Sequence, residues 1–255
     1  MDLSLDLSLA AGYKSGSQIA RVLSEDWVSR ELPCISCGAT PLNHAPTNSP
    51  ALDFVCPGCS SGFELKSKRT AIGSRLVDGE YATLVSRLSS DEAPNFLLLR
   101  YDLSAARVED LYAVHRGLLT PLAIQRRPPL PPTARRAGWV GSVIDLTRLP
   151  EGAMVPLVQN GASRSFEAAR QDWRRYREIK AMPAAQRGWV SDILACVQSL
   201  PSPVFSLREI YRFEGELHVS HPGNQHVRPK IRQQLQALVA MGCIQRLSPG
   251  LYRRV

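Results

Sequence analysis

The residue types best suited to chemistry gather between Asp53 and Lys66. Asp53 lies in the run "ALDFVC", and Glu64 and Lys66 follow in "GFELKSK". Because side chains alternate between the faces of a strand, we expect Glu64 and Lys66 on one face and Leu65 in the core. If the two runs pair as a hairpin, Asp53 faces Glu64 across the ladder. Two carboxylates so placed are suited to bind a hard cation such as Mg²⁺, which takes phosphate oxygens as further ligands.

These three side chains match the needs of phosphodiester hydrolysis. A metal ion activates and orients a water and stabilises the leaving oxygen, and a neighbouring lysine offsets charge in the transition state. We therefore predict Asp53, Glu64 and Lys66 as catalytic residues, with Asp53 and Glu64 as the Mg²⁺ ligands. Taken alone, the pattern fits a solvated strand edge better, because Glu-x-Lys on a strand is common by chance.

Four of the six cysteines have the spacing of a metal site. Two Cys-x-x-Cys pairs, Cys34 with Cys37 and Cys56 with Cys59, are separated by eighteen residues, and two such turns complete a tetrahedron of sulfurs around Zn²⁺. Disulfides are the weaker alternative in a cytosolic chain, and a redox Cys-x-x-Cys would be single and would open a helix. We predict a structural zinc ion held by all four thiolates, with no open coordination position.

The second cysteine pair lies between the two runs that carry the carboxylates. Cys56 follows Asp53 by three residues, and Cys59 precedes Glu64 by five, so this knuckle is predicted to be the turn that joins them. A zinc ion bound there would hold together the hairpin on which the acidic residues sit. The placement favours a metal-dependent site over a solvated edge.

Composition indicates a globular protein with a net positive charge. Its 255 residues suffice for two domains, and 44% hydrophobic with 21% charged residues is typical of soluble proteins. No apolar run reaches the length of a membrane span, and the first residues lack a basic leader, so we expect a cytoplasmic protein without membrane contact. The net charge of +8 favours a polyanionic partner over a merely solvated basic face, because two stretches, 124–139 and 217–255, contain no acidic residue.

Periodicity and chain breakers predict the elements around these motifs. We expect helices at residues 17–32, 77–90 and 166–180, the first of them capped by Ser17. We expect strands at residues 95–103, 108–115, 140–149 and 153–159. Prolines make residues 121–132 a predicted loop. A domain boundary is placed near residues 181–186, which gives one domain over 1–182 and a second over 183–255.

The second predicted domain has the order of a winged helix-turn-helix. Three amphipathic helices are expected, the second opened by a capping box at Ser206 and Glu209 and the third over residues 228–241. Two short strands around a Ser-Pro-Gly turn follow. In a major groove the third helix would turn outward Arg228, Arg232, Gln233 and Gln236. A winged helix that contacts protein is the alternative, which the lack of acidic residues disfavours.

The chain resembles the DpnI family of methyl-adenine-dependent Type IIM restriction endonucleases over essentially its full length. The shared strings are "YKSGSQIARVLSEDWV", "PLNH", "FELKSK", "DGEYAT", "PTARRAGW" and "KIRQQLQ". The resemblance implies a mixed α/β fold, with a PD-(D/E)xK restriction-endonuclease-like domain that embeds a four-cysteine zinc site, and a C-terminal winged helix-turn-helix domain. It places the nuclease motif on Asp53, Glu64 and Lys66, although Leu52 stands where the motif has its leading proline.

The resemblance also implies Mg²⁺-dependent cleavage of double-stranded DNA at G-N6-methyl-A-T-C, read by both domains. Burying one methyl is worth about 0.8 kcal/mol, roughly fourfold in affinity, which gives a reason for two readers. We predict that Arg135, Arg136 and Trp139 read DNA for the first domain; the alternative for Trp139 is an ordinary core tryptophan. The expected partner is adenine-methylated duplex DNA, bound by a monomer.

Two other functions remain open. A zinc-ribbon, winged-helix transcription regulator would have no need of two carboxylates, and a repair or recombination nuclease can use the same fold. Incubation with Mg²⁺ and plasmid from adenine-methylating and non-methylating hosts separates these hypotheses. Digestion of neither plasmid favours the regulator, and scattered cleavage or cleavage confined to branched DNA favours the repair nuclease.

Overall fold

The computed structural model describes residues 1–47, 49, 51–91, 93–175 and 177–255. The chain forms two compact units, each assembled from three separate stretches. Unit 1 contains Met1–Ser74, Glu92–Arg116 and Met154–Arg177. Unit 2 contains Arg75–Asp91, Gly117–Ala153 and Glu178–Val255. The units therefore interleave along the sequence, and a division between residues 182 and 183 stays a prediction.

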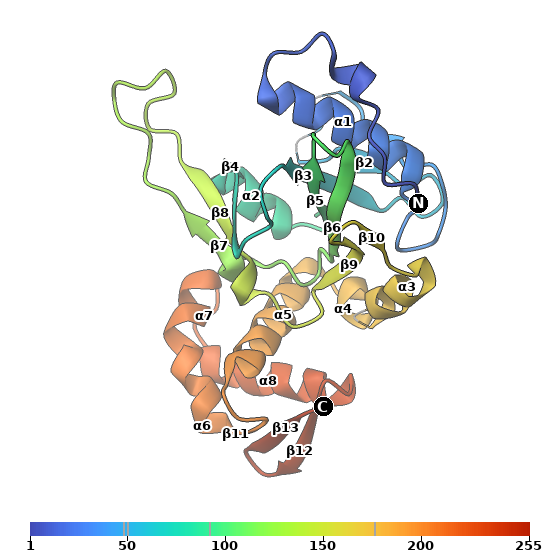
Figure 1. The fold of residues 1–255 in the computed structure, drawn as a ribbon. Coiled ribbons are helices and arrows are strands. Elements are labelled where there is room, and N and C mark those ends of the chain that lie inside the picture. Colours follow the sequence, from blue (N-terminus) through green and yellow to red (C-terminus); the bar gives the residue numbers. More distant parts are fainter. Residues whose placement is uncertain (48, 50, 92, 176) are drawn as a thin grey trace. The chain divides into compact units, whose positions relative to one another are not determined.

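A seven-stranded sheet forms the centre of unit 1 (Figure 1). Its strands, in spatial order, are β1 (Asn43–His44), β2 (Phe54–Val55), β3 (Gly62–Lys68), β5 (Asn95–Asp102), β6 (Arg107–Val114), β9 (Met154–Gln159) and β10 (Ala162–Ser163). β3 and β5 are parallel, and the other neighbours are antiparallel. The strands expected near residues 95–103, 108–115 and 153–159 are confirmed, and the apolar run of β5 is buried because β5 lies inside the sheet.

Helix α1 (Gly16–Glu31) lies against β3 in unit 1, where Ser24 Oγ and Ser67 Oγ are 2.9 Å apart. Its apolar stripe puts Trp27 and Val28 into the core. The predicted cap at Ser17 is wrong. The helix begins at Gly16 because the Ser15 carbonyl accepts from Ile19 N–H, and the Ser15 side chain makes no capping hydrogen bond. A 3₁₀ turn, η1 (Leu7–Ala10), precedes α1.

The helix expected over residues 166–180 is two helices, α3 (Phe166–Arg174) and α4 (Arg177–Ala181). α3 ends in a tight turn in which Arg175 N–H bonds to the Asp172 carbonyl. Residue 176 lies outside the described residues. Trp173 of α3 is buried, and its indole Nε1 donates to Ser36 Oγ at 3.1 Å, between the cysteines of the first pair. α3 therefore supports the first cysteine turn.

A three-stranded antiparallel sheet belongs to unit 2, in the order β4 (Arg75–Glu80), β8 (Gly141–Asp145) and β7 (Ile124–Arg126). The helix expected over 77–90 is confirmed only as α2 (Tyr81–Leu88), because residues 75–80 pair with β8 instead. The expected loop over 121–132 is wrong in its first half. Pro121 opens the 3₁₀ turn η2 (Pro121–Ala123), at a position where no N–H is needed, and β7 follows it.

The strand expected over residues 140–149 stops at Asp145. The Asp145 carboxylate accepts from Thr147 N–H at 3.1 Å and so begins the 3₁₀ turn η3 (Leu146–Arg148). The backbone of this segment therefore leaves the sheet earlier than its apolar alternation indicates.

The winged helix-turn-helix is confirmed in the rest of unit 2 (Figure 1). Its helices are α5 (Ala184–Ser199), α6 (Leu207–Ile210), α7 (Glu214–Ser220) and α8 (Val227–Ala240), with the 3₁₀ turn η4 (Tyr211–Phe213). The second of the three expected helices is therefore divided into α6 and α7 by η4. The capping box of Ser206 and Glu209 has both of its hydrogen bonds. The wing is a sheet of β11 (Val204–Ser206), β13 (Leu251–Arg254) and β12 (Ile244–Ser248). Strand β11 is not predicted from the sequence.

A buried carboxylate joins α5 to the segment before β7 within unit 2. Asp192 accepts hydrogen bonds from the Thr120 hydroxyl and lies 2.7 Å from His221 Nε2. The His221 ring stacks on Trp189 with centroids 4.0 Å apart. Burial raises the pKa of the Asp192 carboxyl, and the bonds from His221 and Thr120 oppose this shift without cancelling it. No helix in the described ranges is long and apolar enough to cross a membrane.

Candidate functional site

The hairpin expected between the two carboxylate-bearing runs is present. β2 and β3 are antiparallel, with Phe54 opposite Phe63 and Val55 opposite Gly62. β2 is only two residues long, shorter than the expected extended run. One residue before it, Asp53 N–H donates to the Phe63 carbonyl at 2.9 Å. Asp53 therefore enters the hairpin next to β3.

The Asp53 side chain is fixed by the backbone of β3. Its Oδ2 accepts a hydrogen bond from Leu65 N–H at 2.7 Å. Asp53 thus contacts the residues on both sides of Glu64, namely Phe63 through its N–H and Leu65 through its carboxylate. The structure brings the two predicted metal ligands to adjoining positions on the hairpin.

Glu64 and Lys66 lie on one face of β3, as the alternation of strand side chains predicts. The Glu64 side chain is buried, with 7% of the residue exposed. Lys66 Nζ forms an ion pair with Glu64 Oε1. Leu65 packs against the hydrophobic core of unit 1. A buried carboxylate held by an ammonium group is the arrangement by which a protein keeps a charged site in its interior.

A further cation near this site comes from α1. Arg21 Nε donates to Glu25 Oε1 at 2.7 Å. The pKa of Arg21 is raised, first by its bond to Glu25 and the charge of Glu25, and also by the charge of Asp53. The sequence reasoning did not single out Arg21. Its four-residue spacing from Glu25 on a predicted helix is the signal that was available.

The four predicted zinc ligands converge in unit 1. All four sulfurs lie within 4.8 Å of one another. Cys34 Sγ and Cys59 Sγ are 3.7 Å apart, and Cys37 Sγ and Cys56 Sγ are 3.4 Å apart. Tetrahedral Zn²⁺ with bonds of about 2.3 Å requires sulfurs roughly 3.8 Å apart. The cluster can therefore hold zinc with little adjustment.

The second cysteine turn connects β2 to β3, as predicted. Cys56 N–H donates to the Ser61 carbonyl at 3.0 Å, and Gly58 N–H points to Cys56 Sγ at 3.3 Å. A Cβ at Gly58 would lie 2.9 Å from the Cβ of Ala39, so the close approach of the two turns requires a glycine here. The cysteine cluster is therefore built into the hairpin that carries Asp53 and Glu64.

Residues 127–141 form an arm that extends β7 and β8. Leu130 N–H donates to the Trp139 carbonyl at 2.9 Å. Trp139 is half-buried, and the Arg136 guanidinium lies over its ring at 4.9 Å from the centroid. The indole Nε1 is buried and has no hydrogen-bond partner among the residues that the structure describes. Arg135 and Arg136 are exposed. The arm belongs to unit 2, together with the winged helix, and not to the unit that carries Asp53.

The predicted DNA contacts of the winged helix lie on the exposed side of α8. Arg228 Nε pairs with Glu214 Oε2 at 2.8 Å, and its guanidinium lies over the Tyr211 ring. Arg232 Nη1 donates to the Tyr211 hydroxyl at 2.8 Å. Gln233 is exposed. Glu214 lies just before the acid-free stretch, so the sequence reasoning did not place a carboxylate beside this helix.

Comparison with known protein families agrees with this architecture. Residues 1–182 match the model of DpnI, described as the Dam-replacing family, and residues 185–254 match the model of the Dam-replacing HTH domain. A sheet-rich first part, a four-cysteine cluster that can hold zinc and a C-terminal winged helix are all present in the structure. These matches imply a restriction enzyme that binds DNA. The chain belongs to the DpnI, Dam-replacing family.

Proposed function

We propose that this protein is a Mg²⁺-dependent endonuclease that cleaves double-stranded DNA at GATC sites containing N6-methyladenine. The observation that supports the chemistry is the position of Asp53, which contacts both neighbours of Glu64 across the β2–β3 hairpin. Family membership supports the dependence on methylation.

Asp53 and Glu64 would hold the Mg²⁺ ion, since paired carboxylates are the ligands that this cation prefers. When bound, Mg²⁺ supplies positive charge that stabilises the phosphodiester in the transition state and activates the attacking water. The Leu65 N–H holds the Asp53 carboxylate at a fixed position, so little reorganisation is needed on binding. Lys66 keeps the Glu64 carboxylate in place and offers positive charge to the phosphate oxygens.

Zinc has a structural role in this proposal. Four thiolates fill a tetrahedral site, so no position remains for water or substrate. Because the Cys56–Cys59 turn connects β2 to β3, zinc would limit the motion of the hairpin that carries Asp53 and Glu64.

The proposed recognition of methylated DNA uses two surfaces of unit 2. The first is the arm, with Arg135, Arg136 and Trp139. The second is α8, with Arg228, Arg232 and Gln233. A single buried methyl contributes only about 0.8 kcal/mol, so two readers of two methyls discriminate better than one. The exposed arginines of both surfaces supply phosphate contacts, and binding should weaken steeply as salt concentration rises.

The test uses purified full-length protein, Mg²⁺ and plasmid from adenine-methylating and non-methylating hosts. Cleavage of the methylated plasmid alone is the expected result. Glu64→Ala should abolish cleavage and still shift methylated GATC duplex in a gel. Digestion of neither plasmid by the unaltered protein would favour a regulator, and equal digestion of both would overturn the dependence on methylation.

A further inference from the structure

Helix α8 carries two adjacent glutamines in opposite surroundings. Gln233 is exposed, whereas only 1% of Gln234 is exposed. Gln234 Nε2 donates to Gln233 Oε1 at 3.3 Å. The amide that faces solvent is therefore held by an amide that solvent does not reach. This contact restricts a side chain that would otherwise rotate freely.

The orientation of the pair follows from the burial of Gln234. Gln234 Oε1 is buried and has no hydrogen-bond partner within the described part of the chain. If the Gln234 amide were turned over, its two N–H donors would be buried in place of one oxygen. An orphaned buried N–H is rarer in proteins than an orphaned carbonyl oxygen. The orientation in which Gln234 donates to Gln233 is therefore favoured.

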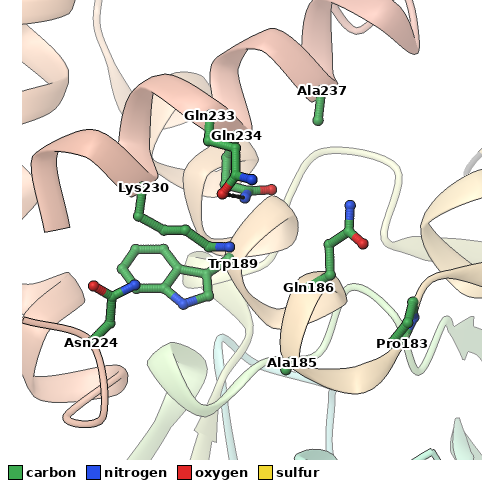
Figure 2. Close-up of a pocket in the computed structure, with 9 residues that line it drawn as sticks. All are labelled: Pro183, Ala185, Gln186, Trp189, Asn224, Lys230, Gln233, Gln234 and Ala237. Atoms are coloured by element: carbon green, nitrogen blue, oxygen red, sulfur yellow. Dashed lines mark hydrogen bonds between the residues drawn. The ribbon is translucent and has the colours of Figure 1, made fainter. Parts of the chain in front are cut away.

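A cavity of about 380 Å³ adjoins the pair between α5 and α8 (Figure 2). In Figure 2 the amides of Gln233 and Gln234 lie together on one side of the cavity, and Gln186 of α5 borders it on another. Lys230 and Asn224 also line it, and none of the described lining residues is acidic. These surroundings suit the edge of a base that offers hydrogen-bond acceptors, because the Lys230 ammonium group would attract such acceptors.

We propose that Gln234 is a positioning residue that sets which half of the Gln233 amide faces DNA. This inference rests on the proposed function, because it requires α8 to read bases. Because the Gln233 oxygen accepts from Gln234, the N–H groups of Gln233 are the half of the amide that would meet a base edge. Guanine offers two acceptors in the major groove, N7 and O6, whereas adenine offers one donor and one acceptor. Gln233 therefore matches a guanine edge, and GATC contains one guanine on each strand.

Binding to modified bases tests this directly. Full-length protein carrying Glu64→Ala, which prevents cleavage, is titrated with methylated GATC duplexes that contain guanine or 7-deazaguanine, which lacks the N7 acceptor. Fluorescence anisotropy should show binding weaker by about fivefold or more for 7-deazaguanine, if the lost hydrogen bond contributes at the lower limit for a base contact. Gln234→Met keeps the side-chain size and removes the amide. We expect the Gln234→Met protein to bind the guanine and 7-deazaguanine duplexes with nearly equal affinity.

Gln234→Glu gives a sharper result when binding is measured at alkaline pH, where the new carboxyl is ionised although burial raises its pKa, because an ionised carboxylate only accepts hydrogen bonds. Gln233 should then donate to this carboxylate and turn its own oxygen outward. The preference should shift away from guanine and toward a base edge with a donor, such as cytosine N4. A variant with a merely structural defect would lose affinity for all bases alike.

The coupling between the two glutamines provides the control. In a Gln233→Ala background, Gln234→Met should have no further effect on the 7-deazaguanine penalty. Ala240→Ser, at the exposed C-terminal end of α8 and outside the predicted DNA contacts, should leave the coupling unchanged. Thermal unfolding checks that each variant is folded, and Gln234→Leu replaces Gln234→Met if the latter does not fold.

The inference is overturned if a folded Gln234→Met protein keeps the full penalty, or if its effect persists without the Gln233 amide. Failure of the proposed function has a different signature, since the unaltered protein would then not cleave methylated plasmid selectively. If the unaltered protein cleaves selectively but the effects of Gln233→Ala and Gln234→Met on the 7-deazaguanine penalty are additive, only the proposed role of Gln234 is removed.

Discussion

The carboxylate of Asp53 accepts a hydrogen bond from the backbone N–H of Leu65 at 2.7 Å. β2 begins only at Phe54, so a side-chain oxygen takes the place of the carbonyl that a longer strand would present to β3. A bond to an ionised acceptor is stronger than one between neutral groups. The same carboxylate thus joins the hairpin together and stands beside Glu64.

Substitution of Asp53 separates its charge from its hydrogen bond. Asp53→Asn keeps an oxygen for Leu65 N–H and removes the charge. We expect cleavage of methylated plasmid to fall by at least about 100-fold, as the loss of several kcal/mol of transition-state stabilisation requires. The free energy of unfolding should change little. Asp53→Ala should be equally inactive and also less stable by about 1–3 kcal/mol in urea unfolding, since the Leu65 donor loses its partner. An active Asp53→Asn protein would contradict the assignment of Asp53 as a metal ligand.

Zinc content should depend on the four clustered cysteines alone. Cys34→Ser removes a buried ligand, and we expect the purified protein to contain no stoichiometric zinc and to unfold at a lower temperature. Cys196→Ser changes a buried thiol outside the cluster and is the matched control, which should retain zinc. Elemental analysis with thermal unfolding measures both. Full stability and cleavage in a zinc-free Cys34→Ser protein would show that the ion does not support the hairpin.

If the arm reads DNA as proposed, its reading should depend on Gly141, which packs against the Trp139 ring. A Cβ at Gly141 would lie 2.9 Å from the indole of Trp139, so Gly141→Ala must displace the ring. We expect Gly141→Ala and Trp139→Ala each to reduce the preference for methylated over unmethylated duplex by about fourfold, the contribution of one buried methyl. Gly79→Ala, where a Cβ meets no atom within 4 Å, is the control. Unchanged preference in a folded Trp139→Ala protein would remove Trp139 as a reader.

Stability should depend on pH through Asp192. Its pKa is raised on folding, with burial as the main cause, while the charges of His221 and Arg148 act in the opposite direction. A carboxyl with a raised pKa stabilises the fold fully when protonated, below its ordinary pKa of 3.8, and this contribution is lost as pH rises. Asp192→Asn does not titrate. Urea unfolding should therefore show the variant gaining stability relative to the unaltered protein as pH rises above about 4. A difference that stays constant over this range would contradict the raised pKa.

The features that could be predicted from the sequence depend on short chain separations. The Cys-x-x-Cys turns, the capping box of Ser206 and Glu209, and the alternation that puts Glu64 and Lys66 on one face all follow from local geometry. The hairpin of β2 and β3 was also predictable, because the Cys56–Cys59 turn connects strands only a few residues apart. The roles of Asp53, Glu64 and Lys66 in cleavage remain proposals.

Other features were decided by partners distant in the sequence. Residues 75–80 form a strand because β8, more than sixty residues away, satisfies their backbone hydrogen bonds, whereas their local pattern predicts the start of a helix. Glu214, at the start of α7, pairs with Arg228 of α8. A carboxylate therefore lies beside a helix whose own charged residues are all basic. Local periodicity contains no information about such pairings.

The sequence by itself therefore determined the spacing of the four clustered cysteines, the alternation that puts Glu64 and Lys66 on one face of β3, and the order of the winged helix. Only the tertiary structure decided that Leu65 holds the Asp53 carboxylate, that the arm shares a compact unit with the winged helix, and that Gln234 holds Gln233. The physical reason is that spacing and periodicity fix the direction of a side chain within its own element. Burial and hydrogen bonding, which select one neighbour among many, arise when the elements pack together.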